Sequence, residues 1–310
     1  MTTNLFFDSK HSDSVRRENL YRGAIYVYSP TKAGAELCEF AREFCEGKFQ
    51  PHHPPKAHEF IEVDQYVDIL KTLKPEFIHH PNCKRLLPQL LKELNCDDQE
   101  TFFDVPRIRT ACPADYLSSG MAYAFKPHRD SWYSTPMCQL NWWLPVYPVT
   151  EDNCMTFHLN YWDRPLRNSS AGFNYQDWNQ VGRKQAHKQG KNDNRVQSEA
   201  VEKVELDPQI RIVAEPGSVI VFSAAHLHST VPNSTDLTRI SIDFRTVNLS
   251  DLKTNHGAPN YDGESTGTTT GDYLRCSDQS HLPQEIISQY RELKPAPLFP
   301  NQRSSSEASL

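Results

Sequence analysis

Several features are scarce in this 310-residue chain, and each absence excludes a class of protein. No apolar run approaches the roughly 18 residues that a membrane-spanning helix needs, so we expect no membrane association. The eight cysteines form no CxxC pair, and the polar first 20 residues lack an apolar secretion segment, which predicts free thiols in a cytoplasmic protein. The net charge is -6, so the chain lacks the excess of basic residues with which proteins bind phosphate backbones. This argues against nucleic-acid binding.

Glycine is also scarce, with 12 residues against 22 prolines, which favours stiff connections over flexible linkers. Apolar residues at helical spacing predict three helices in the first third of the chain, over 29–47, 63–73 and 84–94. Ser29 is expected to cap the first helix, and the second is expected to end near Pro75. The third contains Pro88, which predicts a kink or a late start.

After residue 97 the pattern changes to short runs of β-branched, aromatic and apolar residues. These runs predict strands at 102–105, 108–111, 121–125, 139–144, 155–159, 210–214, 219–222 and 240–244. Helices followed by many short strands predict a mainly β protein, a sandwich or barrel supported by N-terminal helices.

The predicted domain organisation is one domain over residues 21–296, with a loose N-terminal arm over 1–20 and a disordered tail over 297–310. Within the domain we expect a helical part (29–97), a strand-rich core (about 102–247), a polar and basic insertion (160–205) between core strands, and a C-terminal extension (248–296) with one helix near 283–293.

The first chemically informative motif is His128-Arg129-Asp130, at the end of a predicted strand. Residues two apart in a strand share a face, so the imidazole and the carboxylate point into the same space. One more imidazole would complete the two-histidine, one-carboxylate set that binds iron(II) and leaves positions open. Taken alone, such a pair is more often a surface ion pair or a cap.

A second group of residues follows further along the chain. The turn Pro216-Gly217-Ser218 precedes an apolar strand, after which come His226, His228 and, eleven residues beyond His228, Arg239. Ser241 lies two residues beyond Arg239 on the same predicted strand face. Because a guanidinium matches a carboxylate in a two-pronged geometry, Arg239 and Ser241 can hold one carboxylate together.

In this order and spacing, the two groups resemble the iron(II)/2-oxoglutarate-dependent dioxygenases, specifically the phytanoyl-CoA hydroxylase-like branch. The resemblance covers roughly residues 105–247 and implies a double-stranded β-helix core (jelly-roll, cupin-like) with flanking N-terminal helices and a lid-like insertion. It implies iron(II) ligation by His128, Asp130 and His228, with 2-oxoglutarate and O2 as co-substrates. The implied contacts to 2-oxoglutarate are Arg239, Ser241, Thr230, Gln139, Asn141 and Tyr123.

Two features select His228 rather than His226 as the second imidazole ligand: its offset to Arg239, and the Asn233 that follows His228. His226 is expected to be a buried histidine behind the ligands. Two departures from the pattern stand out. The insertion at 160–205 is unusually large and basic, and the stretch 151–158 lacks the Pro-Gly-Ser-His segment of relatives, so no role is assigned to His158.

The resemblance implies that decarboxylation of 2-oxoglutarate is coupled to C–H oxidation, by hydroxylation, desaturation or oxidative cyclisation. The carboxylate of Asp130 argues against halogenation, because halogenating relatives have a small residue there. The basic insertion predicts a small anionic substrate, such as an amino-acid-derived precursor of secondary metabolism or an acyl-CoA. Candidate substrate contacts are Trp132, Tyr133, Arg183, Lys184, Lys188 and Arg245.

Three alternatives remain open from the sequence: a peptide or protein hydroxylase of the same superfamily, a non-catalytic jelly-roll binding protein, and a zinc hydrolase using His226, His228 and a carboxylate. The intact triad with Arg239 argues against the binding protein. The zinc hydrolase leaves Arg239 and Ser241 without a role. The oligomeric state, monomer or homodimer, is also open.

Overall fold

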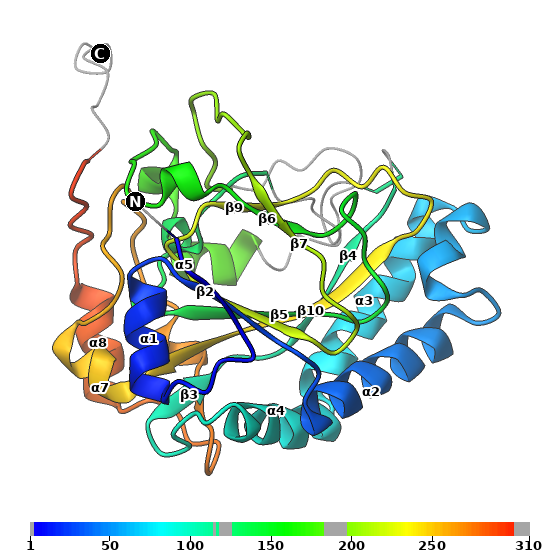
Figure 1. The fold of residues 1–310 in the computed structure, drawn as a ribbon, viewed down its shortest axis with the longest axis horizontal. Coiled ribbons are helices and arrows are strands. Elements are labelled where there is room, and N and C mark those ends of the chain that lie inside the picture. Colours follow the sequence, from blue (N-terminus) through cyan, green and yellow to red (C-terminus); the bar gives the residue numbers. More distant parts are fainter. Residues whose placement is uncertain (1–2, 114–115, 118–125, 183–196, 301–310) are drawn as a thin grey trace.

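The computed structural model describes residues 3–113, 116–117, 126–182 and 197–300. Two β-sheets lie one above the other, and helices cover the outer face of the larger sheet (Figure 1). This sheet-rich arrangement with flanking helices agrees with the expected fold class. None of the described helices is long and apolar enough to cross a membrane.

The larger sheet has the strand order β1-β2-β8-β5-β10-β3-β11, and β4 also pairs with β10. Its strands are β1 (Leu5–Phe7), β2 (Ile25–Tyr28), β8 (Val219–Ser223), β5 (Leu140–Pro145), β10 (Arg239–Asn248), β3 (Thr101–Phe103), β11 (Leu274–Arg275) and β4 (Arg107–Ala111). The smaller sheet has the order β7-β6-β9, from β7 (Ile210–Ile212), β6 (Met155–Phe157) and β9 (His228–Thr230). Among the strands of the described residues, β1 and β2 pair in parallel and the other pairs are antiparallel.

Side chains of the larger sheet alternate between two separate cores. In β8, Val219 and Val221 pack with the helices, whereas Ile220 and Phe222 pack toward the smaller sheet. In β10 the apolar residues at even positions, 240, 242 and 244, join the helical core. Because strand side chains alternate with a period of two, the odd positions of β10 face the space between the sheets. Those positions are Arg239, Ser241, Asp243 and Arg245.

Three helices form where the sequence predicted them, but their ends differ. They are α2 (Lys32–Phe49), α3 (Val63–His79) and α4 (Pro81–Glu93). Thr31 rather than Ser29 caps α2, accepting the backbone N–H of Gly34, while Ser29 bonds Asp8.

The limits that proline was predicted to set on α3 and α4 are not observed. α3 continues past Pro75 because Phe77 extends its buried apolar face. α4 starts early rather than late, because Pro81 suits the first turn and the His80 side chain accepts the next free N–H. Pro88 lies inside α4, where it removes one backbone donor without ending the helix.

The expectation of a loose arm over residues 1–20 is wrong. This segment forms β1 and α1 (Asp13–Tyr21), which Ser12 caps. Arg16 is buried in α1 and bonds Asp13 at 2.8 Å and the sulfur of Cys96 at 3.0 Å. Because the buried face of this short helix contains an arginine, it has no apolar periodicity that would reveal it in the sequence.

The C-terminal extension contains α7 (Leu249–Thr254) and α8 (Gln284–Glu292), the latter matching the helix expected near 283–293. Short helical turns complete the described elements: η1 (Pro54–Glu59), η3 (Asp130–Tyr133), η4 (Leu159–Tyr161), η5 (Ser170–Gly172), α5 (Tyr175–Asp177), η6 (Trp178–Gly182) and η8 (Thr270–Asp272). The strand predicted at 121–125 and most of the predicted tail, 301–310, lie outside the described residues.

Candidate active site

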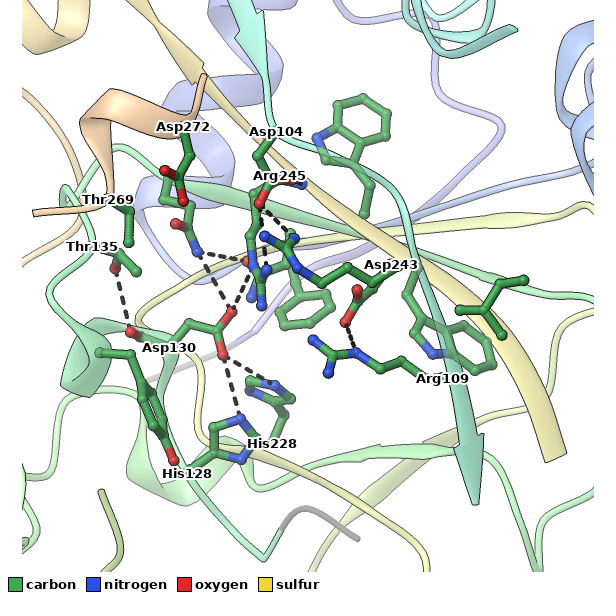
Figure 2. A pocket seen from close by; sticks show the side chains of 18 of the residues that line it. Asp104, Arg109, His128, Asp130, Thr135, His228, Asp243, Arg245, Thr269 and Asp272 are labelled. Carbon is green, nitrogen blue, oxygen red and sulfur yellow. Dashed lines mark hydrogen bonds and ion pairs between the residues drawn. The ribbon is translucent and has the colours of Figure 1, made fainter. Parts of the chain in front are cut away.

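Three potential metal ligands converge between the two sheets. His128 and His228 exchange backbone hydrogen bonds at 3.0 Å in both directions, which fixes the two histidines side by side. Asp130 follows at the start of η3. One ligand atom from each of His128, Asp130 and His228 lies within 4.8 Å of the others, and all three residues are buried (Figure 2).

The hydrogen bonds of the two imidazoles determine which ring nitrogen faces the centre. Nδ1 of His128 lies 2.8 Å from the carbonyl of Lys126, and Nδ1 of His228 lies 3.0 Å from the carbonyl of His226. A carbonyl only accepts, so each Nδ1 donates its proton, and in the neutral imidazole this leaves the lone pair on Nε2. The Nε2 atoms of His128 and His228 lie 3.3 and 3.9 Å from the same oxygen, Oδ1 of Asp130.

Electrostatics favour the metal-binding protonation states. Burial lowers the pKa of His228 to about 3, which keeps its imidazole neutral at physiological pH. Burial alone would favour the neutral acid of Asp130, but His128, Arg245 and His228 outweigh it and hold the pKa of Asp130 well below its usual range. Two neutral imidazoles and one carboxylate are the donor set that divalent iron accepts.

The second carboxylate oxygen of Asp130 is held by the protein. Oδ2 lies 3.5 Å from Nε of Arg245 and 3.5 Å from Nε2 of Gln139. Gln139 in turn accepts a 2.7 Å hydrogen bond from the hydroxyl of Tyr273, and Arg245 pairs with Asp104 at 3.4 Å. This arrangement leaves Oδ1 directed toward the two imidazoles, as Figure 2 shows.

A cavity of about 370 Å³ opens beside these ligands, lined by residues of both sheets. Most sequence-predicted site residues in the described part of the chain line it. These are His128, Asp130, Tyr133, Gln139, Asn141, His228, Thr230, Arg239 and Arg245. Arg245, predicted as a substrate contact, is engaged with Asp130 and Asp104.

Arg239 is a buried cation of this cavity with no acidic partner within 4 Å among the described residues. Its Nη1 makes only long hydrogen bonds, 3.3 Å to the hydroxyl of Thr230 and 3.4 Å to the carbonyl of Asn153. Its guanidinium carbon lies 5.7 Å from the ring centre of Trp143, and burial lowers the pKa of Arg239 to about 10. Within the described structure, its Nε has no hydrogen-bond partner.

Two further buried hydrogen-bond donors on the same inner face have no partner among the described residues. They are Nδ2 of Asn141, which lines the cavity, and Oγ of Ser241, two residues along β10 from Arg239. Buried donors normally have a hydrogen-bond partner. Together with Arg239, they fit a ligand that brings its own oxygen atoms.

Other predicted residues lie elsewhere. Trp132 does not line the cavity: it is fully buried, donates a 2.7 Å hydrogen bond to Asp262 and packs with Tyr161, Leu166 and Leu227. Its proposed role in substrate contact is therefore wrong. Tyr123, Arg183, Lys184 and Lys188 lie outside the described residues.

His226 is fully buried, as expected, with its ring 4.6 Å from that of Trp162 and 5.8 Å from that of Phe157. It is absent from the cavity lining, and its link to the site is the carbonyl that orients His228. His158 bonds Ser229 at 2.9 Å.

Several charged residues that line the cavity were not predicted. β4 contributes Arg109, which pairs with Asp243 at 2.8 Å, and Asp104 pairs with Arg107 at 2.6 Å. The alternation of charged residues along β4 and β10 could have indicated these groups. Lys74 on α3 and Asp272 on η8 also line the cavity, and no local motif marks either of them.

Comparison with known proteins gave neither a matching family model nor a matching curated protein. Among solved structures, the chain is similar to EvdO2 from Micromonospora carbonacea var. aurantiaca (17% identity, TM-score 0.37, covering 61% of this chain and 66% of that one). It thus spans just under two thirds of EvdO2, which has also been solved complexed with 2-oxoglutarate.

Two further similar structures are enzymes of nogalamycin biosynthesis described as non-heme and alpha ketoglutarate dependent. They are the epimerase SnoN (15% identity, TM-score 0.37, covering 76% of this chain and 84% of that one) and the carbocyclase SnoK (14%, 0.39, 77% and 84%). Similarity at these low identities and TM-scores establishes neither the fold nor the function of this chain.

Proposed function

We propose that this protein is an iron(II)/2-oxoglutarate-dependent dioxygenase that oxidises a C–H bond of a small metabolite. One observation supports this most directly. A buried His128-Asp130-His228 triad shares a single cavity with Arg239, a buried cation without an acidic partner in the described structure. A metal-binding hydrolase would need the triad but would give Arg239 no role.

The triad would hold the iron through the Nε2 atoms of the histidines and Oδ1 of Asp130. Bound there, iron(II) would supply the O2 chemistry that couples decarboxylation of 2-oxoglutarate to substrate oxidation. The protein's part is orientation: backbone carbonyls fix both imidazoles, and Arg245 and Gln139 restrain the carboxylate. Such outer contacts determine how well ligands are presented to a metal.

Arg239 would bind the carboxylate of 2-oxoglutarate that lies away from the metal. Its two-pronged guanidinium matches a carboxylate, and the hydroxyls of Thr230 and Ser241 supply nearby donors. Asn141 offers one more donor in the cavity. Burial strengthens these contacts, because water does not compete for the carboxylate.

The volume of the cavity, about 370 Å³, supports a small molecule rather than a folded protein as the primary substrate. We infer an amino-acid-derived or otherwise anionic metabolite, hydroxylated, desaturated or cyclised. The proposal also includes a double-stranded β-helix core of the phytanoyl-CoA hydroxylase-like branch, in one domain over 21–296 with 160–205 as a lid. Its support is the motif order and the cavity between two sheets. We place the protein in the cytoplasm, as a monomer or homodimer.

The test is an anaerobic titration with iron(II) and 2-oxoglutarate, followed through the weak visible charge-transfer band expected at about 500 nm for this chelate at an open iron site. Wild-type protein should develop the band, and His128→Ala should not. His256→Ala is the matched control, because His256 is an exposed histidine that lies outside the sequence motifs of the triad. Absence of the band in folded wild-type protein would refute the proposal, and zinc-dependent hydrolysis would then be tested.

A further inference from the structure

The acidic residues that line the cavity differ in whether they have a basic partner. Asp104 pairs with Arg107 at 2.6 Å, Asp243 pairs with Arg109 at 2.8 Å, and Asp130 belongs to the triad. The fourth acid, Asp272, is half-buried and has no basic group within 4 Å in the described part of the chain. Its side chain accepts one hydrogen bond, from the hydroxyl of Tyr175.

Asp272 lies on the same side of the cavity as the metal ligands. In Figure 2, Asp272 stands with Thr269 and Thr135 above Asp130, whereas Arg109 and Asp243 lie on the opposite side. The backbone fixes this position, since η8 is short and the N–H of Asp272 bonds the carbonyl of Thr269 at 3.0 Å. Asp272 therefore lines the same cavity as the three metal ligands.

Aromatic rings surround the same part of the cavity. Phe173, Tyr175 and Trp178 line it from one segment, which is tied to the segment before Asp272 by backbone hydrogen bonds of 2.9 and 3.1 Å at Thr266. Tyr133 connects this group to the metal site, with its ring 5.1 Å from Phe173 and 5.9 Å from His128. Aromatic faces attract cations, and a neighbouring carboxylate adds a charged hydrogen-bond acceptor.

A half-buried carboxylate without a counter-charge is costly unless a ligand supplies one. Arg239 and Asp272 have no oppositely charged partner within 4 Å among the described residues, and they suit different ligands: Arg239 suits the carboxylate of the co-substrate, and Asp272 suits a cation. We propose that Asp272 and the adjacent aromatic rings bind a protonated amine of the substrate. The inference rests on the proposed function only in calling that ligand the substrate, and it narrows the substrate class to amine-containing metabolites.

The test measures binding of cyclohexylammonium and cyclohexanol, two probes of similar shape that differ in charge, to the purified metal-free full-length chain by ligand-observed NMR. Wild-type protein should bind the amine roughly tenfold more tightly than the alcohol, the preference expected from one charge-assisted hydrogen bond. In Asp272→Asn, whose amide keeps the acceptor for Tyr175, the two affinities should become similar. Asp278→Asn is the matched control, since Asp278 is an exposed carboxylate six residues away and outside the cavity.

Equal binding of both probes by wild-type protein, no binding of the amine at about 10 mM, or an amine preference that persists in Asp272→Asn would each overturn the proposal. Because no metal or co-substrate is present, these results do not depend on oxygenase activity. A failed amine test with an intact iron and 2-oxoglutarate band would reject the Asp272 site alone. Amine binding that depends on Asp272, without the iron and 2-oxoglutarate band, would reject the dioxygenase assignment and leave an amine-binding cavity.

Discussion

Replacing Arg239 with methionine should have opposite effects on the empty protein and on co-substrate binding. In the empty cavity Arg239 is buried without an acidic partner in the described structure, and burial lowers its pKa to about 10. At about 1.4 kcal/mol per pKa unit, this corresponds to roughly 3–4 kcal/mol of destabilisation of the charged form at neutral pH. Arg239→Met removes that cost and keeps much of the side-chain volume, so the free energy of unfolding should stay the same or increase.

Binding of 2-oxoglutarate should weaken strongly in the same variant. Removing one partner of a buried charge pair typically costs about 2–5 kcal/mol, and the remaining hydroxyls of Thr230 and Ser241 favour the lower end. About 2–3 kcal/mol corresponds to roughly 30- to 150-fold weaker binding. Wild-type protein should also gain about 2.7 kcal/mol of stability at a 2-oxoglutarate concentration 100 times its Kd, and the variant should gain far less at that concentration.

The assays are urea unfolding without ligand and titration of the visible band with 2-oxoglutarate. Arg109→Met is the control, because Arg109 pairs with Asp243 and its loss leaves that half-buried acid without this partner. The control should therefore lose stability where Arg239→Met does not. If Arg239→Met destabilises the empty protein as much as the control and binds 2-oxoglutarate normally, Arg239 is a structural residue and the assignment fails.

Four further predictions concern other parts of the molecule. Gln139→Met should weaken iron binding by roughly tenfold in a metal titration, because it removes one of the two contacts, from Gln139 and Arg245, to Oδ2 of Asp130; unchanged affinity would mean that the 3.5 Å contact with Gln139 is incidental. All eight cysteines are buried and unpaired, so a thiol reagent should modify them only after unfolding. Burial raises the pKa of Cys45 to about 12, so its contribution to stability is full below pH 9 and declines as the pH rises toward 12, which urea unfolding at several pH values would detect. Gly23→Ala should lower the free energy of unfolding by at least about 1 kcal/mol, because Gly23 has φ +91° and a new Cβ would lie 2.7 Å from a tryptophan ring. Gly47→Ala, in an open position of α2, should raise the free energy of unfolding by about 0.5–1 kcal/mol in the same assay.

The spacing of His128 and Asp130 predicted that their side chains share a face, whereas the place of His228 beside them was implied by the resemblance to the dioxygenases. Arg239 and Ser241, which have the same spacing, lie on one face of β10.

Trp132 illustrates why residues next to a motif are harder to place. The sequence predicted Trp132 and Tyr133 as neighbours in the cavity, but residues 130–133 form a 3-10 turn. With about three residues per turn, positions three apart lie on the same side. Tyr133 therefore faces the cavity with Asp130, and Trp132 points into the core.

Features that depend on distant segments were not predictable from local pattern. Lys74 and Asp272 reach the cavity from a helix and a short turn about 200 residues apart in the sequence, and nothing near either residue marks it as part of a site. The N-terminal strand and helix were missed for a related reason. Their stability comes from pairing with β2 and from the buried polar contacts of Arg16, neither of which produces an apolar repeat.

The position of β10 has a consequence for how this protein can change over generations. His228 belongs to the smaller sheet and Arg239 to the larger, so the eleven-residue interval between them is the length of chain needed to cross from one sheet to the other. Within β10, deleting a single residue would exchange its charged and apolar faces for the rest of the strand. Substitutions can thus diversify the cavity one side chain at a time, whereas changes in length over 228–245 should be rare among descendants and should be avoided in engineered libraries.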